Sequence, residues 1–333
     1  MDSRQNFARG DLMLNKAVEL LRAGDVVAAP TETVYGLFAD VTNDSAIQRI
    51  YQVKGRPSCN PLIIHVSGLE MARRIAIFSD EAMELVNYFW HVVRLPLTIV
   101  LPMGETHISR FATANLGTVA IRCPSHAMAL DLIDSFGGPL AAPSANTSNS
   151  ISPTTAAMVA SDIGPKIPLI LDGGPCTVGI ESTILDTTVY PYIILRHGGV
   201  TQENLEEFLG QSIQDSLDDE LYRTNKLIQE SSGSGITIKA PGMMPRHYSP
   251  KLALRINAAY PIGNEAFIGF GENVLQCDIN LSKTGDLAEA ARNLYSALKT
   301  LDDPSKYTGI AVMSIPQQGL GIGINDRLLR ASS

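Results

Sequence analysis

Hydrophobic residues recur along the chain in two alternating patterns. Between residues 12 and 21 they repeat at helical spacing, and Gly24 follows as a helix stop. The apolar run at 26–30 then predicts a buried strand. The alternation indicates one α/β domain to about residue 210. It predicts helices at 44–53, 79–90, 126–136, 154–163 and 201–209, and strands at 61–66, 97–102, 118–124, 169–172, 182–188 and 192–196.

Residues 211–250 differ in character from the segments on either side. An acidic, helix-like stretch at 215–230 leads through SSGSG into APGMMPRHYSP, where prolines interrupt the chain. This composition predicts an interdomain linker. The remaining residues, 251–333, predict a small second α/β domain, with strands at 252–257, 265–270, 274–280 and 309–315 and an amphipathic helix beginning near Asp286.

Composition and charge restrict the classes of function. A chain of 333 residues that is 45% hydrophobic and 18% charged can bury a sizeable core, which excludes an intrinsically disordered protein. The net charge of −8 argues against bulk electrostatic capture of nucleic acid or an anionic membrane, so any anion site must be local. Four widely separated cysteines argue against a zinc ribbon or a disulfide framework. With neither a secretory signal nor a long apolar span, we expect a cytoplasmic protein.

Common catalytic and nucleotide-binding motifs are missing from the sequence. It contains no phosphate loop of the type GxxxxGK[ST] and no GxGxxG after a strand. It also contains no GxSxG elbow and no HExxH pair. Covalent hydrolases and zinc peptidases are therefore disfavoured, and any nucleotide must be bound without the common loops.

Polar residues instead follow the predicted strands. Thr31 and Thr33 come directly after the first strand, where open α/β sheets place ligands, although taken alone they fit a turn with satisfied hydroxyls better. Lys54 and Arg56 lie two residues apart in KGRPSCNPL. Two adjacent cations repel unless an anion joins them, so a phosphate-rich ligand is one interpretation and a solvated basic turn is the other.

Two further features suggest anion binding. The stretch AAPSANTSNSISPTT carries hydroxyl and amide side chains up to a helix expected near Pro153, and such a helix start can receive phosphate or ribose oxygens or can simply be capped. Arg122 and Arg196 lie within apolar strands. A buried arginine needs an anionic partner, which is either a structural carboxylate or a substrate.

Taken in order, these motifs resemble the YrdC-type threonylcarbamoyl-AMP synthases. The resemblance covers residues 12–200 through PTETVYGL, KGRPSCNPLIIHV, TVAIRCPSH, AAPSANTS and GIESTILD, and it continues through PGMMPRHYSP and GLGIGINDRLLRA as the long form of the family. It implies a YrdC-like, twisted, open α/β sheet around a basic cavity, with a small Rossmann-like C-terminal domain. We therefore expect a catalytic domain at 1–210, a linker or lid at 211–250 and a C-terminal domain at 251–333.

The resemblance also implies a reaction. L-threonine, bicarbonate or CO2, and ATP carrying Mg2+ would give threonylcarbamoyl-AMP and pyrophosphate. Downstream transfer machinery would use the adenylate for threonylcarbamoyl adenosine modification of tRNA. Threonine carbamate attacks the α-phosphate directly, so positioning and charge neutralisation can carry the chemistry and no catalytic triad is needed.

The site residues follow from the resemblance alone. It makes Lys54 and Arg56 the catalytic residues and provides no protein ligand for a metal. The implied nucleotide contacts are Arg56, Asn60, Thr118, Ser144, Ser152, Arg196 and Tyr248. The implied threonine contacts are Thr33, His65, Arg122, Ala142 and Ser182.

Three structural expectations accompany this assignment. Lys54 and Arg56 are expected to face solvent, so that removing either would abolish turnover with little loss of stability. The segment from Pro245 to Pro250 is expected to fold over the cavity as a lid. Asn149 replaces a glycine usual in the family, and we expect altered loop geometry there without loss of function, because asparagine tolerates a positive φ better than most residues.

Two alternatives compete with this interpretation. A YrdC-like module could bind RNA without chemistry, but the net charge argues against tight tRNA binding. The carbamoyltransferase of hydrogenase maturation also contains a YrdC-like domain, but it carries CxxC zinc fingers and an acylphosphatase module that are absent from this sequence.

Overall fold

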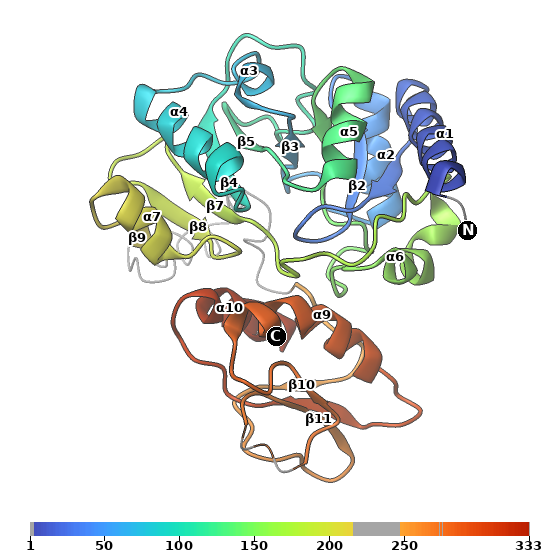
Figure 1. Cartoon of the computed structure of the whole chain (residues 1–333), viewed down its shortest axis with the longest axis vertical. Helices are drawn as coiled ribbons and strands as arrows, with labels where there is room; N and C mark the ends of the chain where they lie inside the picture. The colour runs from blue at the N-terminus through green and yellow to red at the C-terminus, as the bar shows by residue number, and fades with distance from the viewer. Residues whose placement is uncertain (1–2, 216–246, 273, 275, 333) are drawn as a thin grey trace.

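The computed structural model describes residues 3–215, 247–272, 274 and 276–332 (Figure 1). Most of the predicted linker, including the acidic stretch, SSGSG and Arg246, lies outside the described residues. Within the described residues the strands form two sheets, one of nine strands in the order β1-β2-β6-β3-β5-β4-β7-β8-β9 and one of four in the order β10-β13-β11-β12. This arrangement confirms the predicted α/β class.

The larger sheet is mixed, and helices flank it. Its strands are β1 (Val27–Ala29), β2 (Gly36–Asp40), β3 (Ile63–His65), β4 (Leu97–Pro102), β5 (Thr118–Arg122), β6 (Leu140–Ala141), β7 (Thr183–Asp186), β8 (Ile193–Arg196) and β9 (Gln214–Asp215). Its helices are α1 (Ser3–Arg22), α2 (Asp44–Lys54), α3 (Leu69–Ala72), α4 (Asp80–Val86), α5 (Ala127–Phe136), α6 (Ala156–Asp162) and α7 (Gln202–Leu209), with a π-helical turn at Asn87–Val92 and a 3-10 turn at Gly164–Lys166.

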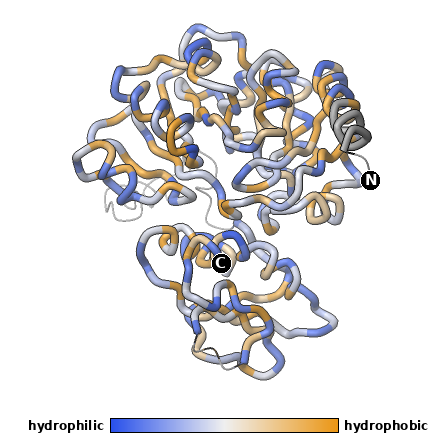
Figure 2. Tube along the Cα trace, viewed as in Figure 1, coloured by the Kyte–Doolittle hydropathy of each residue, from blue (hydrophilic) through white to orange (hydrophobic). Residues whose placement is uncertain are grey.

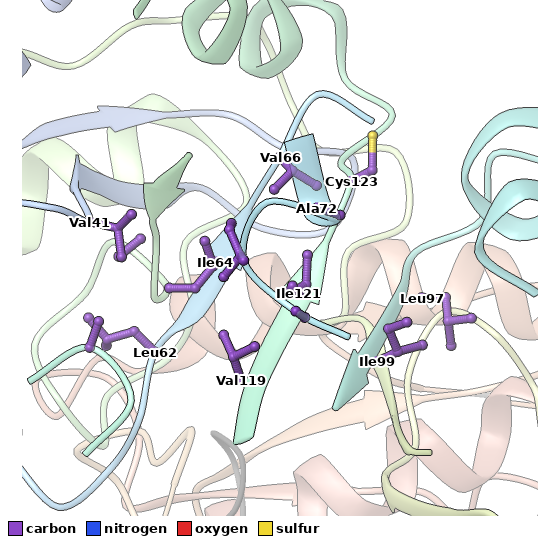
Figure 3. Packing of buried hydrophobic residues seen from close by; sticks show 14 of the residues in the cluster. Val41, Leu62, Ile64, Val66, Ala72, Leu97, Ile99, Val119, Ile121 and Cys123 are labelled. Atoms are coloured by element: carbon purple, nitrogen blue, oxygen red, sulfur yellow. The ribbon is translucent and has the colours of Figure 1, made fainter. Parts of the chain in front are cut away.

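The two faces of the central strands have different roles. Ile64, Val119 and Ile121 point into the main hydrophobic core, together with Leu97 and Ile99 (Figure 3). Side chains alternate along a strand, so the residues between them point to the opposite face. There the register places His65 and Thr98 on either side of Arg122. Figure 2 shows hydrophobic and hydrophilic positions following one another along the chain. Alternation therefore turns one face of the sheet into the main core, and the other face carries these polar side chains beside a smaller apolar cluster.

Helix α2 shows how local sequence positions a site residue. The side chain of Asn43 accepts hydrogen bonds from the backbone amides of Ser45 and Ala46, which begins the helix. Gly55 ends it with φ 61°, in the left-handed region that favours glycine. Lys54 is therefore the last helical residue, and Arg56 begins the following loop.

The second domain has a parallel sheet covered by helices. Its strands are β10 (Leu254–Arg255), β11 (Glu265–Gly269), β12 (Ile279–Asn280) and β13 (Gly309–Val312), and its helices are α9 (Leu287–Leu301) and α10 (Leu320–Ala331). Figure 1 shows α9 and α10 on the side of this domain that faces the larger one. The parallel sheet with covering helices agrees with the Rossmann-like expectation.

The two domains share one hydrophobic cluster. Val34, Ile151 and Ile180 of the first domain belong to the same cluster as Leu294 and Ile324 of the second. The backbones also approach closely, since a Cβ atom on Gly179 would lie 2.3 Å from the Cα atom of Arg292. The second domain is therefore packed directly against the first.

Several sequence-based assignments are wrong in detail. Residues 169–172 form a single bridge between Ala28 and Ile170 and not a strand. The sequence pattern also does not predict β2, β6 or α10, and the helix expected near Pro153 begins at Ala156. Among the described helices, none combines the length and hydropathy needed to cross a bilayer.

Candidate active site

A cavity opens on the polar face of the large sheet. Concave sites with a few convergent polar groups are where proteins usually bind small molecules. Side chains from several separate segments of the chain surround this cavity. The lining residues are Thr31, Thr33, Val34, Gly36, Arg56, Ile63, His65, Arg122, Ala142, Pro143, Ser144, Glu181, Arg196, His247 and Tyr248.

The cavity gathers most of the residues predicted for threonine. Thr33, His65, Arg122 and Ala142 all line it. Ser182 lies just outside the lining, where its hydroxyl is 2.7 Å from that of Thr98. The sequence motifs that carried these residues therefore do meet in space.

Only part of the predicted nucleotide set lines the cavity. Arg56, Ser144, Arg196 and Tyr248 do, whereas Asn60, Thr118 and Ser152 do not. Asn60 is buried, and its Oδ1 has no hydrogen-bond partner among the described residues. Thr118 pairs with Pro102 in the sheet. Ser152 donates to the Glu181 carboxylate at 2.7 Å.

Three arginines give the cavity its positive charge. Arg56, Arg122 and Arg196 are each less than a tenth exposed. Arg56 donates to the carbonyl oxygens of Asn60 and Pro61 at 3.2 and 2.8 Å, and burial lowers its pKa to about 10. A buried cation held by neutral carbonyls, as Arg56 is, favours an anionic ligand, because the ligand compensates its lost hydration.

Arg122 has the structural carboxylate that its position in an apolar strand required. Its Nη2 atom donates to Glu32 Oε1 at 2.6 Å and to the Thr33 hydroxyl at 2.9 Å. The backbone amide of Ser125 donates to the other oxygen of Glu32. The Nε atom of Arg122 is buried without a partner among the described residues, so it remains a donor for a ligand.

The expectation that Lys54 and Arg56 face solvent is wrong. Lys54 is 2% exposed and Arg56 is 9% exposed. The Nζ atom of Lys54 donates to the carbonyl oxygens of Ser144 and Asn146 at 2.5 and 2.6 Å, and Lys54 does not line the cavity. Burial, reinforced by the charge of Arg56, lowers the pKa of Lys54. Lys54 therefore anchors the loop that presents Ser144 to the cavity.

His65 is a neutral residue of the cavity wall. Its Nδ1 atom lies 3.2 Å from the carbonyl oxygen of Ile63, and its ring contacts the edge of Phe38. Burial and the charge of Arg122 lower the pKa of His65 to about 3. An uncharged imidazole at neutral pH can form hydrogen bonds without adding to the repulsion among the arginines.

The described end of the linker reaches the cavity. His247 and Tyr248 line it, and Tyr248 is 1% exposed. The Ser249 amide donates to the carbonyl oxygen of Asn149 at 2.7 Å, and Asn149 has a positive φ, 69°, which asparagine tolerates. Around this contact, buried polar atoms lack a partner among the described residues, namely Ser148 Oγ, His247 Nδ1, Tyr248 Oη and Ser249 Oγ. Such atoms are typical of a site that accepts a polar ligand or water.

Sequence reasoning missed the two carboxylates of the site. Glu32 holds Arg122, and Glu181 lines the cavity. Both lie in motifs rich in hydroxyl and apolar residues. A buried charge next to an apolar strand requires a partner, and this requirement, used above for Arg122, could have identified both glutamates. At the helix start near Pro153 the structure shows the capping alternative, because the side chain of Thr155 accepts a hydrogen bond from the backbone amide of Met158 and so caps α6.

Comparisons with known proteins agree with this arrangement. A family model described as "Telomere recombination" (Sua5/YciO/YrdC) matches residues 19–198. A second model, described as the C-terminal domain of threonylcarbamoyl-AMP synthase, matches residues 200–333.

Individual relatives match over nearly the full length. The threonylcarbamoyl-AMP synthase of Pyrococcus abyssi is 37% identical, with 95% of this chain and 93% of the relative covered. The threonylcarbamoyl-AMP synthase of Bacillus subtilis is 35% identical, with 100% and 96% covered. The crystal structure of P. abyssi Sua5 complexed with L-threonine superposes with a TM-score of 0.82 at 36% identity, covering 96% of this chain and 94% of that one. The chain therefore belongs to the threonylcarbamoyl-AMP synthase family, in the form that carries a C-terminal domain.

Proposed function

We propose that the protein forms threonylcarbamoyl-AMP and pyrophosphate from L-threonine, bicarbonate or CO2, and ATP in the cavity described above. The observation that carries the proposal is the set of three buried arginines, Arg56, Arg122 and Arg196, around one cavity. ATP phosphates and a threonine carboxylate are the anions of this reaction. The solved P. abyssi relative, which is complexed with L-threonine, supports the amino-acid substrate.

The positions of the arginines suggest how the substrates are arranged. Arg122, with its free Nε atom and with Thr33 and neutral His65 beside it, suits the threonine carboxylate and hydroxyl. Arg56 and Arg196, with Ser144 and Tyr248, suit the nucleotide. An oxygen of threonine carbamate attacks the α-phosphorus, the bond to the bridging oxygen breaks, and pyrophosphate leaves. The protein's contribution is alignment of the two substrates and neutralisation of the developing charge.

Magnesium is proposed to enter with ATP. Among the described residues, no group of three His, Cys, Asp or Glu side chains could hold a metal ion. The carboxylates of Glu32 and Glu181 are both engaged by arginines. The protein's donor set therefore does not suit a resident Mg2+, whereas ATP phosphates supply hard oxygen ligands. The adenylate would pass to downstream tRNA threonylcarbamoyl transfer machinery, and we do not expect tRNA itself to bind tightly.

The direct test is incubation of the purified full chain with ATP, L-threonine and labelled bicarbonate. We expect pyrophosphate and a labelled adenylate, both dependent on threonine and both stopped by EDTA. Arg56→Ala should reduce the rate about tenfold to a hundredfold, because a charge-assisted contact contributes roughly 1.5–3 kcal/mol. Arg49→Ala, on the outer side of α2, is the matched control. Tight tRNA binding without any labelled adenylate would contradict the proposal and support the RNA-binding alternative.

A further inference from the structure

The last helix of the chain sends one arginine to the wall of the cavity. Arg327, on α10, is 0% exposed. Its Nε atom donates to Glu181 Oε2 at 3.1 Å, and its Nη1 atom donates to the carbonyl oxygens of His197 and Gly323. Glu181 itself lines the cavity. A residue near the C-terminus thus contacts the cavity through a single side chain, that of Glu181.

The same arginine contacts a second cavity residue. Its guanidinium carbon lies 5.5 Å from the centre of the Tyr248 ring. Tyr295 of α9 completes the group, because its hydroxyl donates to Glu181 Oε2 at 2.9 Å and its ring centre is 5.7 Å from that of Tyr248. Two side chains of the second domain therefore hold one residue of the first domain and one of the linker.

The charge of Glu181 explains why this contact matters. A carboxylate beside a phosphate site repels the phosphates unless a cation compensates it, and the repulsion is strong where water is excluded. Burial would raise the pKa of Glu181, but the charges of Arg327 and Arg196 outweigh burial and lower it to about 2. Glu181 is therefore ionised at neutral pH. Arg196 lines the cavity and is assigned above to the nucleotide, whereas Arg327 stays outside the lining and pairs with Glu181 and with its own neighbour Asp326.

We propose that Arg327 is a positioning residue for ATP, which neutralises Glu181 and fixes it together with Tyr248 at the cavity wall. The inference rests on the proposed function, because it assumes that the cavity binds ATP. It gives the C-terminal domain a part in the chemistry of the site that goes beyond attachment to the first domain.

Charge balance and simple domain packing make different predictions. If Arg327 acts through Glu181, removing both charges should restore ATP affinity that is lost when only the arginine is removed. In Arg327→Met, the unpaired and buried Glu181 should also take up a proton at higher pH, so the defect should shrink as the pH falls. The other titratable or charged groups around this pair keep their side chains in the variant; they are Arg196, His247, Tyr248 and Tyr295 beside Glu181, and Asp326 of α10, which loses Arg327 but keeps Arg330.

The experiment measures the ATP dissociation constant of the full chain by calorimetry for four proteins: wild type, Arg327→Met, Glu181→Gln and the double variant. We expect Arg327→Met to bind ATP at least tenfold more weakly at pH 7.5, and the double variant to match Glu181→Gln within about threefold. The ATP dissociation constant of Arg327→Met, divided by that of the wild type, should become smaller as the pH is lowered from 7.5 to 6. Arg255→Met, which breaks the Arg255–Glu265 pair within the second domain, should not change ATP affinity.

Each outcome decides the matter. The proposal would be overturned if Arg327→Met bound ATP as tightly as the wild type. It would also be overturned if removing Arg327 weakened ATP binding by the same factor in the Glu181→Gln background as in the wild type. A loss of folding in Arg327→Met that Glu181→Gln does not rescue would overturn it as well, because the arginine would then serve domain packing and not charge balance. If the wild type itself does not bind ATP, the proposed function fails, and that result is distinct from a failure of this inference alone.

Discussion

Replacing Lys54 by methionine should destabilise the first domain, although methionine keeps most of the unbranched apolar side chain. The Nζ atom donates to Ser144 O at 2.5 Å, to Asn146 O at 2.6 Å and to Asn146 Oδ1 at 3.4 Å. Methionine can make none of these hydrogen bonds. Two buried carbonyl groups would lose their partner, and the loop that carries Ser144 would lose its anchor.

The expected loss is about 2–4 kcal/mol. A hydrogen bond from a charged donor contributes roughly 1.5–3 kcal/mol, and a buried acceptor left unpaired costs about 1–3 kcal/mol. Relief from burying an ammonium group offsets part of this sum. With a urea m-value of about 1–3 kcal/mol/M, the unfolding midpoint should fall by roughly 1 M.

Trp90 provides the assay, because it is the single tryptophan of the chain and is buried in the first domain. Its fluorescence during urea unfolding follows that domain alone. Lys166→Met is the matched control, since Lys166 is exposed and its Nζ atom reaches only the Val53 carbonyl at 3.5 Å. It should change stability by less than about 0.5 kcal/mol. Equal, small shifts for both variants would refute the structural role of Lys54.

Three further predictions follow from the site. Threonine should be used at least about 100-fold faster than valine, with serine between them, because valine leaves buried polar groups unpaired. The rate of pyrophosphate release measures this preference, and equal rates with threonine and valine would contradict it. Tyr248→Ala should weaken ATP binding about tenfold in calorimetry, whereas exposed Tyr190→Ala should not. The pKa of Glu181 falls from 4.5 to about 2 on folding, so its ionised form stabilises the fold at neutral pH and this contribution disappears as the pH falls from 4.5 towards 2. Glu181→Gln should therefore unfold at a lower urea concentration than the wild type at pH 7, and at a similar concentration near pH 2.5. If the two urea midpoints differed by the same amount at both pH values, the ionised Glu181 would not be the source of this stability.

Periodicity predicted most of the fold because most elements are amphipathic or fully buried. It failed at β2, where GLFAD directly follows a polar motif, and at α10, where Gly321 and Gly323 lower the helix propensity. Gly321 is required there because a Cβ atom would lie 1.9 Å from the Pro316 carbonyl oxygen. The conformations of β2 and α10 thus depend on tertiary packing more than on the local sequence pattern.

The candidate site was only partly predictable for a similar reason. Sequence motifs identified Arg56, Arg122 and Arg196, but they could not show that Lys54 turns inward from the end of α2. They also could not show that Arg327 crosses from the second domain to Glu181, since that contact joins residues 146 positions apart. Pairings over such distances depend on how the domains pack, and a single sequence contains no local signal for them.

The hydrophobic cluster shared by the two domains has a consequence for anyone who wants to work with the catalytic domain alone. A chain ending near residue 210 would place Val34, Ile151 and Ile180 in water, since their partners on α9 and α10 would be gone. A contiguous apolar patch of this kind promotes self-association of an isolated fragment. A soluble fragment would therefore need polar replacements at these three positions, and any loss of activity on truncation should be assessed only after aggregation has been excluded by light scattering.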